Sequence, residues 1–364
     1  MPQKAGCAGI DFDYCAGTRQ RLMKPRADYL TSLASPLSIA GHLLPNRAFL
    51  APMAGITDRP MRLIAERFGA GLVVSEMIAS NALATGHGDM VRKLRKSGRL
   101  PHMVQLAGCE AQWMRRGAEI AADAGADIID LNFGCPAKRV TNGFAGSALM
   151  RVPDEALRLV ETVVAATSLP VTVKMRLGWD EASLNAPEIA RRAVNAGARM
   201  ITVHGRTRQQ FYKGEARWHL VRAVVEAVQA PVVVNGDIID LATAREALRQ
   251  SGAAAVMMGR GAQGQPWVVG QVGAALANRP AAVAPTADAL VDLVTEHYDG
   301  VLHEYGIEVG VRAARKHLDW YLEAAGLAPA KEARWALLNS PEPQDVRRMI
   351  KGLFGRPAPL PQAA

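Results

Sequence analysis

A cysteine that directly follows a buried strand is the side chain in this sequence best placed for chemistry. The apolar pair Ile128-Ile129 predicts a strand over Ile128–Leu131, and the turn Gly134-Cys135-Pro136 continues neither a strand nor a helix. Loops that leave the strands of an α/β enzyme carry its reactive groups, because the sheet holds them rigidly. A single cysteine is otherwise a small apolar packing residue. The role of Cys135 therefore depends on which other side chains reach the same edge.

Polar side chains recur where six consecutive predicted strands end. A buried polar group needs hydrogen-bond partners, so polar groups at six successive strand ends are hard to explain by packing alone. We therefore predict an active site at this end of the sheet. The residues are Gln105, Asn132 with Cys135, Lys174 with Arg176, His204 with Arg206, Asn235 with Asp237, and Gly259-Arg260-Gly261.

The last two strand ends predict a phosphate site. Gly236 and the Gly259-Arg260-Gly261 turn follow the seventh and eighth predicted strands, where barrels bind phosphate through backbone N–H groups. Arg260 would add a charge-assisted contact. Lys174, on the fifth predicted strand, has two possible roles: its ammonium would stabilise negative charge on a reduced flavin, and it would equally form a Schiff base. These positions indicate a phosphorylated ligand or cofactor.

Eight short β-rich runs, each but the second followed by a predicted helix, must position these groups. Eight strand–helix units over about 235 residues are typical of a (β/α)8 TIM barrel, an α/β fold. A doubly wound sheet is the rival, but it would more often show a glycine-rich dinucleotide fingerprint after the first strand, and Ala51–Gly55 is not one. The predicted strands are Phe49–Met53, Leu72–Ser75, Met103–Leu106, Ile128–Leu131, Val171–Met175, Met200–His204, Val232–Asn235 and Ala255–Met258.

The pattern becomes purely helical after Pro285, which predicts a small C-terminal helical bundle. The helices are expected at Ala287–Tyr305, Val309–Ala325, Lys331–Leu338 and Gln344–Leu353. On the second, a basic face would contact phosphates or merely solvate the helix, and it carries Arg312, Arg315 and Lys316. We thus expect an N-terminal extension over residues 1–35, the barrel over 36–284, the bundle over 285–355 and a tail over 356–364.

The chain is basic, with a formal charge of +9 over 364 residues, which favours a polyanionic partner. The densest cluster, Arg92–Arg99, has five basic residues in eight, although such a run is usually just a solvated face. No apolar run reaches the roughly 18 residues of a membrane span. The four cysteines show no paired metal-ligand spacing. We expect a cytoplasmic protein with free thiols, without a metal and without a membrane anchor.

Seven short motifs follow one another along the chain. They are Leu50-Ala51-Pro52-Met53-Ala54-Gly55-Ile56-Thr57-Asp58, Ser75-Glu76-Met77, Gln105-Leu106-Ala107-Gly108, Asn132-Phe133-Gly134-Cys135-Pro136, His204-Gly205-Arg206-Thr207, Asn235-Gly236-Asp237 and Gly259-Arg260. Taken together, these motifs resemble those of the tRNA-dihydrouridine synthase family, and their order and spacing agree from about residue 45 to 355. The basic helix with Arg312–His317 and Trp320-Tyr321 resembles the family too. Cys135-Pro136-Ala137-Lys138 is most similar to the bacterial B-type branch.

The resemblance implies an FMN-dependent barrel that uses NADPH to reduce the C5–C6 bond of a uridine in the tRNA D-loop, at position 17 for the B-type branch. It implies that Cys135 is the proton donor, with Asn132 near the target uracil. Two residues depart from the family pattern: Phe133, where methionine is commoner, and Phe144, which interrupts a run of small residues. The implied flavin contacts are Pro52, Met53, Gln105, Lys174, His204, Asn235, Gly236, Asp237, Gly259 and Arg260, and the implied tRNA contacts are Asn132, Lys138, Arg176, Arg206, Arg312, Arg315 and Lys316.

The implied chemistry agrees with the residue types. The uracil C5–C6 bond is conjugated to a carbonyl, so a hydride should add at C6 and a proton at C5. A cysteine thiol is mostly protonated at neutral pH and suits an acid better than a nucleophile. Two other functions stay open on the sequence: a barrel flavoenzyme acting on a free pyrimidine or another small molecule, and a non-catalytic RNA-binding protein. The second would explain the charge but not the polar strand ends. A monomer is expected.

Overall fold

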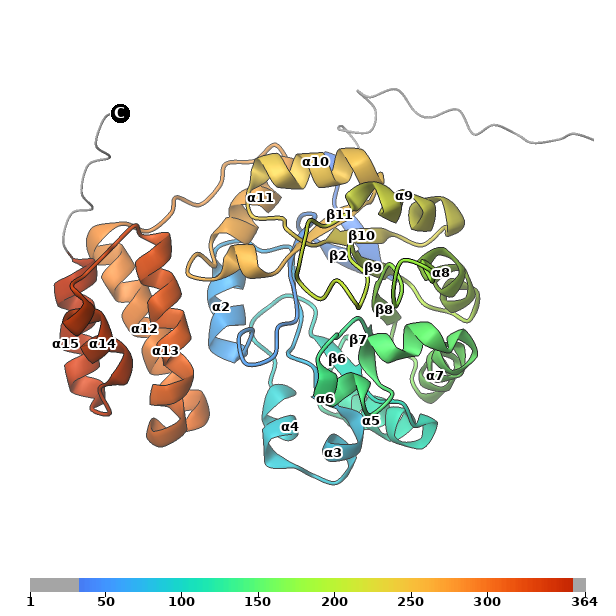
Figure 1. The fold of residues 1–364 in the computed structure, drawn as a ribbon, viewed down its shortest axis with the longest axis horizontal. Coiled ribbons are helices and arrows are strands. Elements are labelled where there is room, and N and C mark those ends of the chain that lie inside the picture. Colours follow the sequence, from blue (N-terminus) through green and yellow to red (C-terminus); the bar gives the residue numbers. More distant parts are fainter. Residues whose placement is uncertain (1–32, 356–364) are drawn as a thin grey trace, which may run out of the picture.

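The computed structural model describes residues 33–355. The first 32 residues of the predicted N-terminal extension and the whole predicted tail over 356–364 lie outside the described residues. The described chain forms a barrel of strands surrounded by helices, and four further helices pack beside it (Figure 1).

All nine strands of the main sheet are parallel, as a (β/α)8 barrel requires. Their order is β4-β3-β11-β10-β9-β8-β7-β6-β5, and a parallel bridge from Val74, directly after β4, to Met103 of β6 closes the barrel. The predicted TIM-barrel fold is therefore confirmed. The strands are β3 (Ala48–Leu50), β4 (Leu72–Val73), β5 (Ile78–Ala79), β6 (Met103–Ala107), β7 (Ile128–Phe133), β8 (Val171–Arg176), β9 (Ile201–His204), β10 (Val232–Asn235) and β11 (Ala255–Met258).

The second strand of the barrel is interrupted, which the prediction of one strand over Leu72–Ser75 did not foresee. The β4 half pairs with β3 and the β5 half pairs with β6. At the break, the Ser75 hydroxyl accepts a hydrogen bond from the Gln105 backbone N–H at 2.9 Å. It also donates to the Glu76 carbonyl at 2.9 Å. A side chain thus replaces the missing ladder contact between the two strands.

Helices surround the barrel, and polar side-chain caps fix where two of them begin. The Asp58 carboxylate accepts a hydrogen bond from the Met61 N–H at the start of α2, and Asp240 with Thr243 forms a capping box on α10. The short α3 and α4, together with α6, were not predicted. The helices are α2 (Arg59–Arg67), α3 (Ser80–Ala84), α4 (Gly88–Lys93), α5 (Ala111–Asp123), α6 (Lys138–Thr141), α7 (Pro153–Ala166), α8 (Ala186–Asn195), α9 (Trp218–Ala227), α10 (Leu241–Ser251) and α11 (Val268–Leu276), with 3-10 turns at Gly146–Arg151 and Arg260–Ala262.

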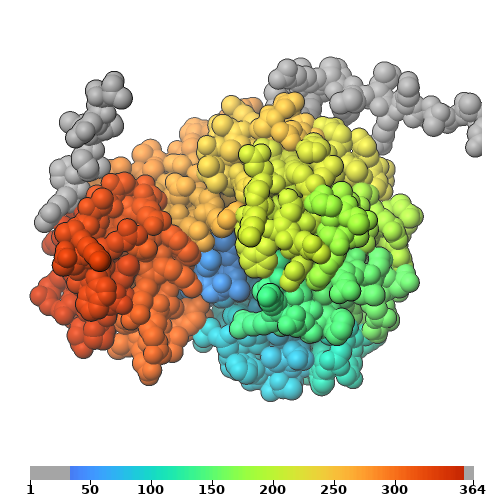
Figure 2. Space-filling view, in the orientation of Figure 1, coloured from blue at the N-terminus to red at the C-terminus, as the bar shows by residue number. Residues whose placement is uncertain are grey.

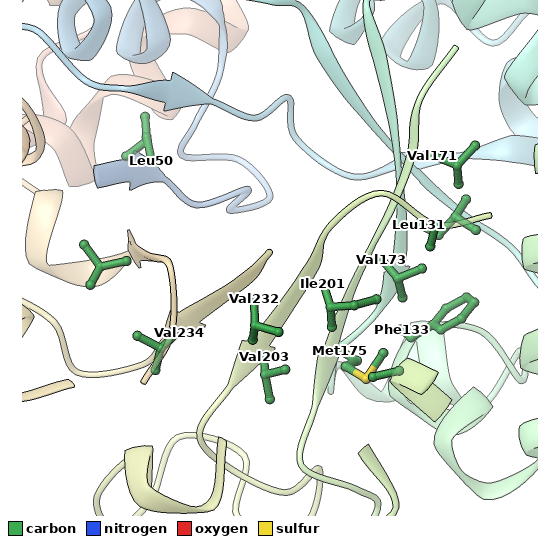
Figure 3. Close-up of a cluster of buried hydrophobic side chains, with 14 of the residues drawn as sticks. Leu50, Leu131, Phe133, Val171, Val173, Met175, Ile201, Val203, Val232 and Val234 are labelled. Atoms are coloured by element: carbon green, nitrogen blue, oxygen red, sulfur yellow. The ribbon is translucent and has the colours of Figure 1, made fainter. Parts of the chain in front are cut away.

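Successive side chains of each strand point alternately outward and inward. The outer face is apolar, whereas the inner face changes from apolar to polar along the barrel axis. Outward residues such as Leu131, Val173 and Val203 pack under the helices (Figure 3). Inward residues near the strand starts, such as Met103, pack on a hairpin of β1 (Leu37–Ile39) and β2 (His42–Leu44). Further along the five strands from β6 to β10, the inward positions are polar, as at Gln105, Lys174 and Asn235. The barrel is therefore plugged with apolar side chains at one end and lined with polar ones at the other.

Four helices form the C-terminal bundle: α12 (Ala287–Tyr305), α13 (Ile307–Ala324), α14 (Lys331–Asn339) and α15 (Pro343–Phe354). Their apolar core continues into the barrel helices through Ile64 and Trp267. At its centre, the His297 Nδ1 lies 2.9 Å from the Tyr321 hydroxyl, and the His297 and His317 rings are 4.6 Å apart. Burial lowers the pKa of His297 to about 4 and holds the pKa of His317 well below its usual value.

These histidines predict that the bundle loses stability in acid. An unfolded histidine titrates near pH 6.5, whereas folded His297 stays neutral until about pH 4, so stability falls as the pH drops between these values. The gap corresponds to roughly 3 kcal/mol for His297. Replacing His297 by phenylalanine removes the titrating ring, and replacing Tyr321 by phenylalanine as well avoids leaving its hydroxyl without a partner. Urea titrations at pH 7 and 4.5 should show the double variant losing less stability than wild type, and equal losses would contradict the prediction.

Candidate active site

A cavity of about 790 Å³ opens at the carboxyl ends of the barrel strands. Figure 2 shows the hollow where blue, green and yellow-green segments meet. All ten residues predicted to contact a flavin line this cavity, and so do the predicted Asn132, Cys135 and Arg176. Lys138, Arg206, Arg312, Arg315 and Lys316 do not line it. The predicted site residues thus separate into a group that converges on one cavity and a group that lies around it.

A chain of buried side chains forms the floor. The register places Gln105 beside Asp130 and Asp130 beside Thr172 on neighbouring strands. The Asn132 amide donates to Gln105 Oε1 at 2.7 Å, Gln105 Nε2 donates to Asp130 Oδ2 at 2.7 Å, and the Thr172 hydroxyl donates to Asp130 Oδ1 at 2.6 Å. Burial raises the pKa of Asp130. Because each amide is held at both ends, Gln105 and Asn132 present fixed polar edges to the cavity.

Lys174 and His204 supply one titratable cation and one neutral ring. Lys174 Nζ donates to Asn235 Oδ1 at 3.2 Å, and the Asn235 amide in turn donates to the Met257 carbonyl at 2.7 Å. Burial, together with the nearby Arg176, lowers the pKa of Lys174 to about 8. Burial and the surrounding cations hold the pKa of His204 well below its usual value. At neutral pH, Lys174 is charged and His204 is not.

The Cys135 turn is clamped on both sides. The Asn132 side-chain oxygen accepts a hydrogen bond from the Cys135 N–H at 2.9 Å, and the Cys135 carbonyl accepts from the Ser147 N–H and hydroxyl at 3.0 and 2.9 Å. Arg176 Nε donates to the Gly134 carbonyl at 2.9 Å. Gly146 has a φ of +62°, and a β-carbon there would lie 2.8 Å from the Cys135 carbonyl oxygen. The half-buried thiol therefore lies on a rigid loop that lines the cavity.

Arg206 was predicted to contact tRNA, but its side chain is buried with only 2% of the residue exposed. Its guanidinium donates to both carboxylate oxygens of Asp237, at 2.8 and 2.5 Å, and to the Lys213 and Gly214 carbonyls at 3.2 and 2.5 Å. Asp237 also accepts from Arg260 Nη2 at 3.1 Å and from the Ala216 N–H at 2.8 Å. Arg206 therefore fixes the wall of the cavity, and its predicted contact with tRNA stays a prediction.

Glycines let the backbone pack closely against its neighbours at the end of the cavity that Asp237 and Arg260 flank. A β-carbon on Gly236, whose φ is +110°, would lie 3.0 Å from the His204 ring and 2.8 Å from the Ala216 β-carbon. A β-carbon on Gly261 would lie 2.6 Å from the Ile238 carbonyl oxygen. Only glycine fits at these two positions, so bare backbone and the Arg260 guanidinium face this end of the cavity.

An aromatic loop that was not predicted covers one side of the mouth. The Tyr212 ring contacts both the Arg176 and the Arg260 guanidinium groups, which lie 5.5 and 5.1 Å from its centroid. Phe211 packs edge-on against Tyr212 with ring centroids 4.8 Å apart. Both residues line the cavity. The loop lies beyond the strand ends, and no strand periodicity pointed to it.

The remaining predicted tRNA residues lie outside the cavity. Lys138 is exposed on α6, and exposed Arg312 pairs with Glu308 at 3.2 Å. Lys316 reaches the barrel: a β-carbon on Gly55, in the loop after β3, would lie 3.2 Å from its Nζ. Arg315 is half-buried on the same helix. Of the three α13 cations, Lys316 reaches a loop next to the cavity-lining Ala54 and Ile56.

The basic cluster Arg92–Arg99 is largely neutralised by carboxylates. Arg92 and Arg95 lie 3.5 and 3.6 Å from Glu304 of α12, and the Arg92 guanidinium also covers the Tyr305 ring. Lys96 pairs with Asp127 at 3.0 Å. In the sequence, this run alone was weak evidence for a polyanion-binding patch, because such runs are usually solvated faces. The structure shows that much of the cluster instead joins the barrel to the bundle.

Two buried carboxylates that help to build the site received no role from the sequence. Asp130 anchors the floor, and its place two residues before Asn132 on a predicted strand was a usable signal. Glu76 accepts a hydrogen bond from the Gly55 N–H at 2.6 Å and lies 3.7 Å from Lys93 Nζ, so it holds the loop after β3. Glu76 falls at the break in the second strand, where the strand pattern gives no orientation.

Within residues 33–355, no helix has the length and apolar character to cross a membrane. The same described residues contain no group of three or more His, Cys, Asp or Glu side chains arranged to hold a metal ion.

Comparison with known proteins places the chain in a family. The sequence model described as "Dihydrouridine synthase" matches residues 49–349. The chain is 52% identical over 301 residues to a "Probable tRNA-dihydrouridine synthase" of Rhizobium leguminosarum, covering 83% of this chain and 93% of that protein. A protein of the same name from Rhodobacter capsulatus is 54% identical over 307 residues, with 84% and 94% covered. The "tRNA-dihydrouridine synthase B" of Pseudomonas putida is 41% identical over 313 residues, with 85% and 92% covered.

Solved structures support the fold alone. A 2-naphthoyl-CoA reductase superposes with a TM-score of 0.53 at 14% identity, covering 69% of this chain and 53% of that one. A histamine dehydrogenase from Rhizobium superposes with a TM-score of 0.52 at 15% identity, covering 74% and 51%. The chain thus spans about half the length of each of these larger proteins. On the sequence matches, this chain belongs to the dihydrouridine synthase family.

Proposed function

We propose that this protein reduces the C5–C6 bond of a uridine in the tRNA D-loop to 5,6-dihydrouridine, with bound FMN and with NADPH as reductant. The observation that carries the proposal is the convergence of a clamped thiol, a buried ammonium and a glycine-lined cationic end in one cavity of about 790 Å³. Membership of the family supports the reaction, and the relatives' names supply its substrate. Action in the cytoplasm and reaction at position 17 belong to the same proposal.

The cavity fits FMN in size and in the order of its donors. Ligand sites of cofactor size commonly enclose about 300–1,000 Å³. The glycine-lined end with Arg260 suits a phosphate, because Gly236 and Gly261 line it with bare backbone beside a guanidinium. Pro52 and Met53 supply an apolar wall for the ring, while Gln105, Lys174 and His204 supply its polar edge. The chemistry that a bound flavin supplies is hydride delivery to C6 of the uracil.

The side chains of this chain would perform three tasks. Lys174 holds a positive charge beside the position of the flavin, where a buried cation stabilises developing negative charge. Asn132, fixed by Gln105, orients the uracil and holds the Cys135 turn. Cys135 gives its thiol proton to C5 as the C6–H bond forms, so the electron pair of the C5–C6 double bond becomes the new C5–H bond.

The first experiment follows the absorption spectrum of the purified protein before and after anaerobic NADPH, and then after unmodified tRNA. Yellow protein that bleaches with NADPH and recovers its colour with tRNA, with dihydrouridine detected in the RNA, is the expected result. Protein that neither carries nor takes up FMN would refute the reductase proposal. Sequencing the product across the D-loop tests position 17.

A free pyrimidine is the alternative substrate, and one observation favours it: the neutralised Arg92–Arg99 cluster supplies less charge for RNA than the sequence suggested. Salt separates the two substrates, because an RNA that displaces counterions binds much more weakly as salt rises. KM for tRNA should rise steeply as the salt concentration is raised. A salt-independent KM together with turnover of free uracil or uridine would favour the alternative.

Lys174 predicts that flavin binding weakens in alkali. Its pKa of about 8 means that the ammonium is lost as the pH rises through that value. FMN affinity should therefore fall a few-fold between about pH 7 and about pH 9.5, as measured by quenching of flavin fluorescence. Lys174→Arg keeps its charge over this range and should bind FMN with little pH dependence. Lys174→Met should be equally flat but weaker at neutral pH. A wild-type profile that matches the arginine variant would contradict this role.

A further inference from the structure

Two exposed phenylalanines have an unusual backbone conformation: Phe211, which lines the cavity, and Phe144, on the loop after α6. Phe144 is 69% exposed and has a φ of +59°, and Phe211 is 41% exposed and has a φ of +55°. A bulky side chain rarely adopts a positive φ, because its β-carbon crowds the following carbonyl. Exposure means that neither ring recovers this cost by full burial. Residues held in strained conformations without return in packing are typical of functional sites.

The surrounding contacts hold Phe211 at the edge of the cavity. The Arg176 guanidinium, itself buried, donates to the Phe211 carbonyl at 2.8 Å and to the Thr207 carbonyl at 2.9 Å. The ring of Phe211 lines the cavity and packs edge-on against Tyr212. Because the residue is 41% exposed, part of the ring stays available to a ligand at the mouth.

The Phe144 loop is attached both to the Cys135 turn and to the Phe211 loop. The Phe144 N–H donates to the Thr141 carbonyl at 3.0 Å, and two residues later Gly146 packs on Cys135. Arg208 Nη2, on the Phe211 loop, donates to the Thr141 hydroxyl at 3.5 Å. Two exposed cations, Lys138 and Arg139, lie on α6, directly before the Phe144 loop. The two rings therefore belong to adjoining loops beside the proposed acid.

We propose that Phe144 and Phe211 form an aromatic clamp that stacks on the single-stranded bases flanking the reacting uridine. This inference rests on the proposed function. A uridine must leave its stack to enter the cavity, which exposes the faces of its neighbours. Aromatic side chains beside lysine and arginine are what single-stranded RNA loops bind, since every base offers a π-face and every phosphate a charge. The clamp stabilises the opened loop, whereas Cys135 and the floor act on the extruded base.

The test exploits the backbone conformation. Phe144→Gly and Phe211→Gly remove the ring at positions where glycine is favoured, so their melting temperatures should stay close to that of wild type. KM for unmodified tRNA should rise about ten-fold for each. The kcat at saturating tRNA should change far less. Phe144→Trp should restore a near wild-type KM. Leu43→Ala removes an equally exposed apolar side chain, 67% exposed on the hairpin at the other end of the barrel, and should behave as wild type.

A binding readout separates stacking from general RNA affinity. 2-Aminopurine placed on either side of the mapped reacting uridine should change its fluorescence when wild type binds, and this change should be lost in the glycine variants at saturating protein. If both glycine variants keep the wild-type KM and the wild-type fluorescence change on binding, the clamp is overturned while the reductase proposal stays intact. If wild-type protein instead fails to reduce any tRNA, the proposed function falls first.

Discussion

Replacing Cys135 with alanine is expected to lower the rate of tRNA reduction by roughly 10²–10⁴-fold, which is what a positioned general acid contributes. The fold should persist, because the turn is held through the backbone of Cys135 and through its neighbours, not through the thiol. NADPH should still bleach the flavin at the wild-type rate, since that half-reaction needs no proton at C5 of uracil. Stopped-flow absorbance measures the two half-reactions separately.

Two further variants sharpen the Cys135 experiment. Cys109→Ala removes the other free cysteine of the described chain and should retain near wild-type turnover. The Cys109 Sγ lies 3.1 Å from the carbonyl oxygen of Gly143, on the loop that follows α6. Cys135→Ser supplies a hydroxyl, which is a much weaker acid than the thiol. The residual rate of tRNA reduction should therefore stay low and should depend on the pH of the assay. Full turnover by Cys135→Ala would show that another group supplies the proton.

Most of the barrel was predictable because strand periodicity and helix capping are local. An inward Lys174 two residues from Arg176 on one strand, or Asn235 at the end of another, follows from alternation once the strand is found. Parallel strands bring their carboxyl ends to one edge, so polar strand ends had to meet. The sequence therefore located the cavity, and the resemblance to a family supplied the names of its proposed ligands.

What the sequence could not provide were partners distant along the chain. In the sequence, Arg206 cannot be distinguished from an arginine that binds RNA. Only the fold shows that Asp237 neutralises its charge. The charges of Arg92 and Arg95 meet Glu304, far along the chain, through contacts between barrel and bundle. The break in the second strand depends on the Ser75 hydroxyl taking a backbone bond from Gln105. Each of these is a tertiary contact that overrides a local pattern.

Asp237→Asn is expected to destabilise the barrel by about 3–5 kcal/mol, the usual cost of leaving a buried charge without its partner. The guanidinium of Arg206 would lose the carboxylate that accepts two of its hydrogen bonds, and Arg260 would lose its anchor. Asparagine tolerates the φ of +52° at this position, so the change tests charge and not backbone strain. Urea titration at neutral pH measures the loss, and FMN affinity should fall with it because Arg260 flanks the proposed phosphate end.

A double-mutant cycle with Arg206→Met separates the ion pair from other effects of the substitution. A methionine side chain needs no counter-charge, so the double variant should recover part of the stability that Asp237→Asn alone loses.

The pH dependence of stability gives an independent check on the ion pair. Burial would raise the pKa of Asp237, but hydrogen bonds from Arg206 and Ala216 and the charge of Arg260 outweigh it and lower that pKa. The pair therefore stabilises the fold above the normal aspartate range, and the difference between wild type and Asp237→Asn should shrink as the pH falls below about 4. The ion pair would be refuted if the two substitutions lower the stability additively and if the stability difference between wild type and Asp237→Asn does not depend on pH.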